Sequence, residues 1–307
     1  MQCQRPGLAK YAHTKLLLDQ LRSPLPRFLF RGFHPASGGG QNPRLNGKAG
    51  ITPHAFLHGR KTPTTMWDIP NLRKMADDHL DAETGMETEF TSWTPLLDVA
   101  LGFATRSAFG YIAVVDTWLL DTEIYNTVDL ALVGLAAWGF DYEYLAYGPI
   151  SGPAYHCVSV DEIYASGYGQ IDNTNMGDAC VNGLFSITSA DVALAKGIAR
   201  ILWTAPDSSP DAIVTLTAVL VNLRSQRVRD GLDMLLSPVD INTFLGCMQE
   251  EIQALKPMPY LSSSRLLSPS RDIREVDELG DMIKLLLAFE ESVVVTVMSG
   301  AAGNDFS

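Results

Sequence analysis

The chain has 307 residues, a length that favours one or two domains. Its hydrophobic content of 46% excludes a wholly disordered protein, and its net charge of −12 argues against a protein that coats duplex nucleic acid. The charge is uneven, because residues 1–75 carry 12 Lys and Arg against 2 Asp and Glu. This basic opening segment suits a phosphate-bearing ligand and equally suits an acidic face of the same chain.

The first third of the chain predicts two helices separated by a strand and a loop. Leucines on one side of residues 9–22 predict a helix that ends before Pro24. The apolar residues 27–31 predict a strand, and the Gly- and Pro-rich residues 35–50 predict a long loop. Residues 69–80 predict the second helix.

The middle of the chain predicts strands that alternate with short helices. Residues 89–93 predict a strand, and Thr94 and Pro95 have the character of an N-cap and a first helical residue, so a helix is expected to follow at once. Further strands are expected at 111–115, 141–147 and 155–160. From about residue 170 the pattern becomes helical, with helices expected at 187–203, 211–229, 240–255 and 273–290.

Several chemistries lack their motifs in this sequence. There is no GxSxG elbow, no Walker loop and no GxGxxG after a strand. His54 and His58 are four residues apart, but no third ligand accompanies them, so no metal is expected. His79 and His156 are interpreted as structural. The start lacks the apolar core of a signal peptide, and no stretch is long enough to span a bilayer, so we expect a cytoplasmic protein, or a secreted effector if a leader was removed.

Three strand-like segments each present a conspicuous polar group. Arg31 closes an apolar strand and offers a planar fork for phosphate or carboxylate, or for a structural acid. Ser92 precedes the expected helix, where a hydroxyl orients a neighbouring group or serves local capping. In a strand, the side chains of Asp141 and Glu143 would project to one face, roughly 6–7 Å apart. Such a pair of carboxylates resembles the arrangement used in glycosidic bond cleavage, and it is equally typical of a strand face exposed to solvent.

The order of these groups resembles the Arg-Ser-Glu class of mono-ADP-ribosyltransferases, in its cholera and heat-labile enterotoxin branch. The likeness covers roughly residues 27–165, with Ser92-Trp93-Thr94 in place of Ser-Thr-Ser and Asp141-Tyr142-Glu143 in place of Glu-x-Glu or Gln-x-Glu. The pattern around Arg31 and residues 51–56 also resembles an uncharacterised domain common in fungal proteins.

The resemblance implies an α/β (α+β) fold, with a split β-sandwich around an NAD cleft. It implies an N-terminal helical extension at 1–26, a catalytic domain at 27–168 and a mainly helical C-terminal domain at 169–307. It further implies transfer of ADP-ribose from NAD, as substrate, to a protein side chain, with no metal. The family's NAD-binding positions correspond here to Arg31, Gly32, Ser92, Thr94 and Glu143.

The same resemblance implies a role for each residue. Arg31 would hold NAD, Ser92 would orient Glu143, and Glu143 would stabilise the ribosyl cation as nicotinamide leaves. Asp141 would position or deprotonate the acceptor, and its charge favours arginine. An aromatic residue near the site, Phe103, Trp138 or Phe140, would stack on nicotinamide or the target, although core packing is preferred for Phe103.

The chain departs from the family at two positions, and two other functions stay open. Trp93 is bulky where a small residue is usual, and Asp141 is one methylene shorter than Glu. One alternative function is an NAD glycohydrolase that uses the same residues on water. The other is a non-catalytic binding module, in which the basic loop around residues 31–60 engages an acidic or phosphorylated partner.

Overall fold

The computed structural model describes residues 6–21, 25–37, 45–57, 64–81, 87–172, 187–204, 210–228 and 238–254. Helices and small antiparallel sheets are mixed, which is the expected α+β class. The chain divides into two compact units, one ending at Val160 and the other beginning at Asp161. The division lies earlier than residue 168. The helix expected at 273–290 lies outside the described residues.

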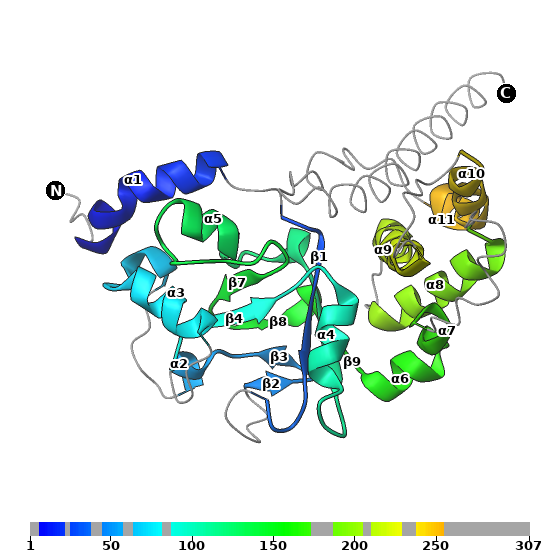
Figure 1. Ribbon diagram of the computed structural model, residues 1–307, viewed down its shortest axis with the longest axis horizontal. Helices are drawn as coiled ribbons and strands as arrows, with labels where there is room; N and C mark the ends of the chain where they lie inside the picture. The colour runs from blue at the N-terminus through cyan, green and yellow to red at the C-terminus, as the bar shows by residue number, and fades with distance from the viewer. Residues whose placement is uncertain are drawn as a thin grey trace, which may run out of the picture. The chain divides into compact units, whose positions relative to one another are not determined.

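The first unit contains three antiparallel sheets, each of three strands (Figure 1). Sheet A has the order β1 (Phe28–Phe33), β5 (Tyr111–Asp116), β9 (Tyr155–Ser159). Sheet B has the order β2 (Asn46–Gly47), β3 (Gly50–Ile51), β8 (Ile150–Ser151). Sheet C has the order β4 (Phe90–Trp93), β7 (Tyr144–Tyr147), β6 (Ile124–Asn126).

Helices of the first unit connect and cover these sheets. The α-helices are α1 (Pro6–Leu21), α2 (His54–Leu57), α3 (Leu72–Leu80), α4 (Leu97–Ala104) and α5 (Thr127–Leu132). Three short 3-10 helices are η1 (Met66–Asp68), η2 (Thr117–Leu119) and η3 (Gly152–Ala154). No helix among the described residues is long and apolar enough to cross a membrane.

The central strand of sheet C, β7, is buried on both faces. Leu145 and Tyr147 pack in one core with residues of η1 and α3, among them Trp67. Tyr144 and Ala146 point to the opposite face, where they pack in a second core. The second core also takes in Leu29 and Val115 of sheet A, so sheets A and C share a hydrophobic core.

A single backbone pair joins β1 to the end of β4. The amide of Phe30 donates to the carbonyl of Thr94 at 2.7 Å, and the amide of Thr94 donates to the carbonyl of Phe30 at 2.9 Å. Next to this pair, a Cβ on Gly32 would lie 1.7 Å from the carbonyl oxygen of Ala100. Glycine at this position therefore allows α4 to pack directly on β1.

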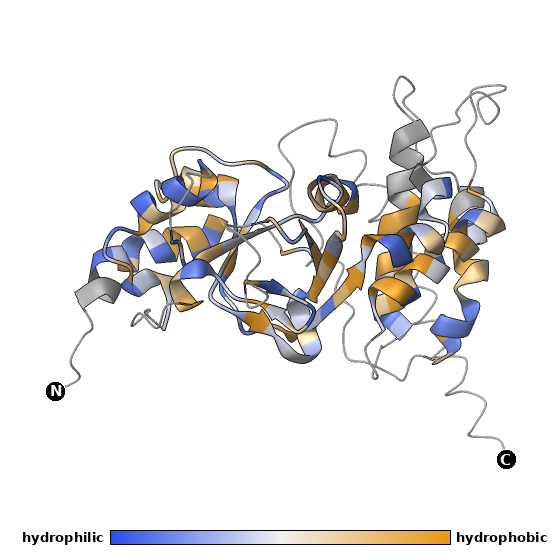
Figure 2. Cartoon of the chain, turned by 90° about the horizontal axis from the view of Figure 1, so that it is seen from below, coloured by the Kyte–Doolittle hydropathy of each residue, from blue (hydrophilic) through white to orange (hydrophobic). Residues whose placement is uncertain are grey.

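The second unit is helical within its described residues. Its helices are α6 (Val160–Ala165), α7 (Tyr168–Asp172), α8 (Ser189–Leu202), α9 (Pro210–Val228), α10 (Pro238–Cys247) and α11 (Gln249–Ala254). Figure 2 shows hydrophobic residues gathered on helices of this unit. An ion pair of 2.7 Å between Lys196 and the buried Glu251 links α8 to α11. The single helix expected at 240–255 is interrupted at Met248, so this segment forms two helices, α10 and α11.

Three sequence predictions in the first unit need correction. The strand expected at 141–147 begins only at Tyr144, so Asp141 and Glu143 precede it. The helix expected directly after Thr94 begins at Leu97, and the Thr94 hydroxyl accepts a hydrogen bond of 3.2 Å from the Leu96 amide. The loop expected at 35–50 contains β2 and the first residue of β3.

Candidate active site

Arg31 lies on β1 with its guanidinium fixed by two uncharged acceptors. Its Nε donates to Oδ1 of Asn46 at 3.2 Å, and its Nη1 donates to the backbone carbonyl of Ser92 at 2.8 Å. Burial lowers the pKa of Arg31 to about 10, against the opposing effects of Tyr155 and Glu143. The side chain is therefore still charged at neutral pH, and the charge lies in a place where water solvates it poorly.

Ser92 and Glu143 lie on adjacent segments of sheet C. Ser92 on β4 pairs with Leu145 on β7, and Glu143 comes directly before the first residue of β7. Although Glu143 is outside the strand, a hydrogen bond joins the Ser92 side chain to its carboxyl.

Glu143 is held by its backbone in the turn before β7. Its amide donates to the carbonyl of Phe140 at 3.0 Å, and its carbonyl accepts from the amide of Thr127 at 2.9 Å. Burial raises the pKa of the Glu143 carboxyl, while the hydrogen bond from Ser92 and the charge of Arg31 lower it. The carboxyl group thus combines partial burial with two neighbours that favour its charged form.

His79, interpreted from the sequence as structural, contacts the candidate site directly. Its Nε2 lies 2.9 Å from the Ser92 hydroxyl, and its Nδ1 lies 2.7 Å from the Thr88 hydroxyl. Burial, reinforced by the charge of Arg31, lowers the pKa of His79 to about 4. The imidazole is therefore neutral at neutral pH, with one donor and one acceptor nitrogen.

These contacts set the direction of the hydrogen bonds when Glu143 is ionised. An ionised carboxylate only accepts, so the Ser92 hydroxyl must donate its one proton to Glu143. Nε2 of His79 must then donate to the Ser92 oxygen, and Nδ1 must accept from Thr88. No local sequence motif identifies His79, because its partners come from β4 and the segment before it.

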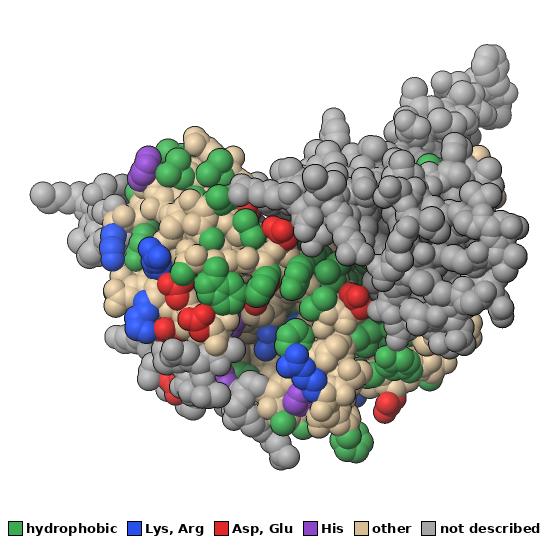
Figure 3. All heavy atoms as spheres, viewed as in Figure 1, with side chains coloured by type: hydrophobic (Ala, Val, Ile, Leu, Met, Phe, Trp, Pro, Cys, Tyr) green, Lys and Arg blue, Asp and Glu red, His purple; other side chains and the backbone are tan. Residues whose placement is uncertain are grey.

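A loop of exposed aromatic residues leads into Glu143. The rings of Phe140 and Tyr142 stack with centroids 5.6 Å apart and are 43% and 36% exposed, and Trp138 packs edge-on against Phe140 at 5.0 Å. Figure 3 shows that hydrophobic side chains share the visible surface of the first unit with acidic and basic ones. We call Trp138, Phe140 and Tyr142 the aromatic stack.

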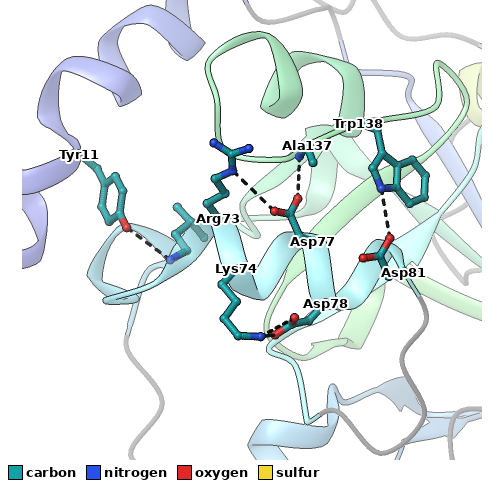
Figure 4. Close-up of polar contacts among 9 residues, drawn as sticks. Tyr11, Arg73, Lys74, Asp77, Asp78, Asp81, Ala137 and Trp138 are labelled. Carbon is teal, nitrogen blue, oxygen red and sulfur yellow. Dashed lines mark hydrogen bonds and ion pairs between the residues drawn. The ribbon is translucent and has the colours of Figure 1, made fainter.

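The start of this loop is tied to α3 (Figure 4). Asp77 accepts from the amide of Ala137 at 2.6 Å, and Asp81 accepts from the Trp138 indole at 3.2 Å. The end of the loop is tied to α5, because the Thr127 hydroxyl accepts from the Phe140 amide at 2.8 Å and donates to the Phe140 carbonyl at 3.0 Å. The exposed rings therefore stand on a fixed backbone.

Asp141 lies between the stacked rings in the chain, in a turn rather than a strand. The period-two argument that placed its carboxylate beside Glu143 therefore does not apply. Its backbone carbonyl accepts from the Asn126 side chain at 2.7 Å. Within the described part of the chain its carboxylate makes no hydrogen bond or ion pair.

The remaining predicted residues have packing or backbone roles in the structure. Gly32 gives α4 access to β1, and Thr94 pairs with Phe30, while NAD contact by either stays a prediction. Phe103 is 48% exposed beneath the guanidinium of Arg106, which corrects the preference for core packing. His58 lies outside the described residues, and no group of three metal-ligating side chains occurs among those described.

Residues 24–162 match a family model described as a domain of unknown function (DUF7587). The match covers less than half of the chain, begins within the first compact unit and ends two residues beyond it. Arg31, His79, Ser92, Asp141 and Glu143 all lie within the matched segment. Neither the comparison with curated proteins nor the comparison with solved structures gave a match.

Proposed function

We propose that the protein is an NAD-dependent mono-ADP-ribosyltransferase. One observation carries the proposal: Ser92 accepts from Arg31 through its backbone carbonyl and contacts Glu143 through its hydroxyl. A cation suited to phosphate and a carboxylate suited to a ribosyl cation thus share one positioning residue. The order and types of these residues also match the resemblance drawn from the sequence.

The fold supports the same proposal at a coarser level. Sheets A and C share a core, and the Phe30–Thr94 pair connects them next to Arg31. We interpret this pair of sheets as the split β-sandwich of the ADP-ribosyltransferases, with the NAD cleft where β1 separates from β4. Arg31 and Ser92 would then lie at the point of separation, with Glu143 beside them.

The described residues fit the chemistry of NAD as a substrate. Arg31 would bind the diphosphate, and Glu143 would hydrogen-bond the ribose and stabilise the positive charge that develops at C1′. The C1′–N bond breaks with its electron pair on the nicotinamide nitrogen, so nicotinamide leaves as a neutral base. Because the leaving group is neutral, it needs no general acid, and the ionised Glu143 carboxylate can assist cleavage without a second, protonated carboxyl group.

The surface before Glu143 supports an arginine side chain as acceptor. A guanidinium stacks well on aromatic faces, and the exposed rings of Phe140 and Tyr142 flank Asp141 in the chain. The guanidino nitrogen would attack C1′ and lose its proton to Asp141, which returns it to water. This acceptor surface favours transfer to protein over hydrolysis by water.

The proposal is tested by nicotinamide release from NAD. The wild type is compared with Glu143→Gln, which keeps the shape of the side chain, and with Glu250→Gln, which changes an exposed glutamate of the second unit. Glu143→Gln should reduce release by about 100-fold or more, whereas Glu250→Gln should leave it unchanged. Equal release by Glu143→Gln and wild type would contradict the assigned site.

A second measurement separates the other functions. Mass spectrometry of an arginine-rich protein acceptor should show addition of ADP-ribose in the presence of wild type. Free ADP-ribose alone would favour the NAD glycohydrolase. Absence of both nicotinamide release and any thermal stabilisation by NAD would favour the binding module, because a bound ligand stabilises the native state.

A further inference from the structure

Two arginines near β1 have different partners. Arg27 donates from Nε and Nη2 to Asp116, both at 3.1 Å, and both residues are buried. Arg31, four positions later, donates instead to an amide oxygen of Asn46 and to a backbone carbonyl. Among the described residues no carboxylate forms an ion pair with Arg31. Within the part of the chain that the structure describes, Arg27 thus has an ion-pair partner, whereas Arg31 has only uncharged hydrogen-bond acceptors and the charge of Glu143 acting on it without an ion pair.

Asn46 is held in place by sheet B and by β9. It lies opposite Ile51 in the β2–β3 pair, and the carbonyl of its neighbour Gly47 accepts a hydrogen bond of 2.6 Å from the Tyr155 hydroxyl. Tyr155 is buried in sheet A. Two consecutive residues of β2 thus contact sheet A, one through Arg31 and one through Tyr155.

The amide of Asn46 orients Arg31 without cancelling its charge. An arginine N–H only donates, so Asn46 must present its oxygen. The guanidinium has five N–H groups, of which two are used here and three make no hydrogen bond to the described residues. An aspartate at this position would offer the same oxygen but would form an ion pair, as Asp116 does with Arg27.

We propose that Asn46 is a positioning residue that fixes Arg31 while reserving its positive charge for the diphosphate group of a ligand. Two linked phosphates present anionic oxygens that match the planar fork of arginine. That the diphosphate belongs to NAD rests on the proposed function, whereas the reservation of charge rests on the contacts of Arg31.

The test compares Asn46→Asp with Asn71→Asp, which adds the same charge at the exposed start of α3, where the asparagine side chain makes no capping hydrogen bond. Calorimetry gives the dissociation constants for NAD, ADP-ribose and inorganic pyrophosphate. Asn46→Asp should weaken all three by at least about tenfold without lowering the melting temperature of the free protein. Asn71→Asp should stay within about twofold of wild type.

Two further variants separate charge from structure. Asn46→Ala removes the acceptor without adding charge, and it should weaken binding less than Asn46→Asp. In an Arg31→Ala background, Asn46→Asp should cause no further loss, because its effect acts through the guanidinium. Equal losses for the two Asn46 variants, or additive losses in the double variant, would overturn the inference.

The outcomes for this inference and for the proposed function are distinct. Unchanged affinity in Asn46→Asp would overturn the inference and leave the proposed function standing. A wild type that binds ADP-ribose and pyrophosphate but releases no nicotinamide would support the inference and contradict the proposed function. A wild type that binds none of the three ligands would overturn both.

Discussion

The imidazole of His79 and the hydroxyl of Ser92 lie 2.9 Å apart, so the last turn of α3 contacts β4. Ser92 is thereby bounded on one side by a neutral imidazole and on the other by the Glu143 carboxyl. Its hydroxyl has one proton, which goes to the ionised Glu143 carboxylate, while Nε2 of His79 donates to the Ser92 oxygen. The position of this proton is the basis for the first prediction.

Replacing Ser92 with alanine should shift the acidic limb of the pH–rate profile upward. The hydrogen bond from Ser92 lowers the pKa of Glu143, so its loss raises that pKa further above its usual range. Glu143 must be ionised to stabilise the ribosyl cation, and the rate near neutral pH should fall by about tenfold. Nicotinamide release measured across pH 5 to 9 checks both effects.

The pH–rate profiles of Ser92→Ala and of the wild type are compared at saturating NAD. A limb that stays at the wild-type position, with only a uniform loss of rate, would show that Ser92 acts on the position of Glu143 rather than on its ionisation. A profile that shifts downward would contradict the assigned direction of the hydrogen bond.

Stability should fall as the pH decreases from about 6.5 towards 4 because of His79. The folded-state pKa of His79 is lowered to about 4, so the unfolded chain binds this proton more readily than the native one. Protonation therefore favours the unfolded state over that interval, and it lowers the free energy of unfolding by on the order of 2–3 kcal/mol for this group. Urea unfolding at pH 7 and pH 4.5 measures the difference.

His79→Gln removes this titration while keeping a neutral side chain that can hydrogen-bond. The variant should lose less stability than wild type between the two pH values, even if it is less stable at pH 7. An identical loss in both proteins would show that other groups cause the acid sensitivity.

Removing the two exposed rings of the aromatic stack should separate transfer from NAD cleavage. Phe140→Ala together with Tyr142→Ala should raise the KM for a protein acceptor about tenfold, because exposed cation–π contacts contribute about 0.5–1 kcal/mol each. Nicotinamide release without acceptor should stay close to wild type. Phe109→Ala, at a ring that is 74% exposed elsewhere on the first unit, is the control. A fall in both activities would place these rings in NAD binding.

Adding one methyl group at Gly139 should displace the aromatic stack. A Cβ there would lie 2.3 Å from the carbonyl carbon of Thr127, so Gly139→Ala must move the loop or α5 and disturb the Thr127–Phe140 hydrogen bonds. We expect a destabilisation of about 1–3 kcal/mol and a loss of transfer. Thermal unfolding and acceptor labelling measure the two effects.

Gly102→Ala provides the matched control, because nothing lies within 4 Å of a Cβ at that helical position. It should be neutral or stabilising by up to about 1 kcal/mol. If Gly139→Ala behaves like Gly102→Ala, the loop is free to adjust and does not set the position of the rings.

Two of the three expected strands that carry the candidate residues are confirmed, and the third begins later than expected. The strands holding Arg31 and Ser92 were predicted, because apolar and aromatic residues cluster there and leave one polar group conspicuous. The tyrosine-rich sequence around Glu143 predicts a strand there, but in the structure Glu143 lies in the turn before β7. Asn126 and Thr127, which hold the turn before β7, come from another element, and no local pattern reports their hydrogen bonds.

The residues that the sequence did not reveal depend on contacts between distant segments. Asn46 lies on a two-residue strand inside a stretch rich in Gly and Pro, where a loop is the ordinary prediction. His79 is one of several polar residues on an amphipathic helix, and only the packing of α3 beside β4 directs it to Ser92.

The double burial of β7 ties the candidate site to the stability of the whole first unit. Glu143 is attached to a strand whose two faces belong to two different cores and whose two edges pair with β4 and β6. We expect amide exchange in such a strand to require global rather than local opening. The backbone that carries Glu143 should therefore be in place before any ligand arrives, and heat should displace it only at the temperature at which this unit melts.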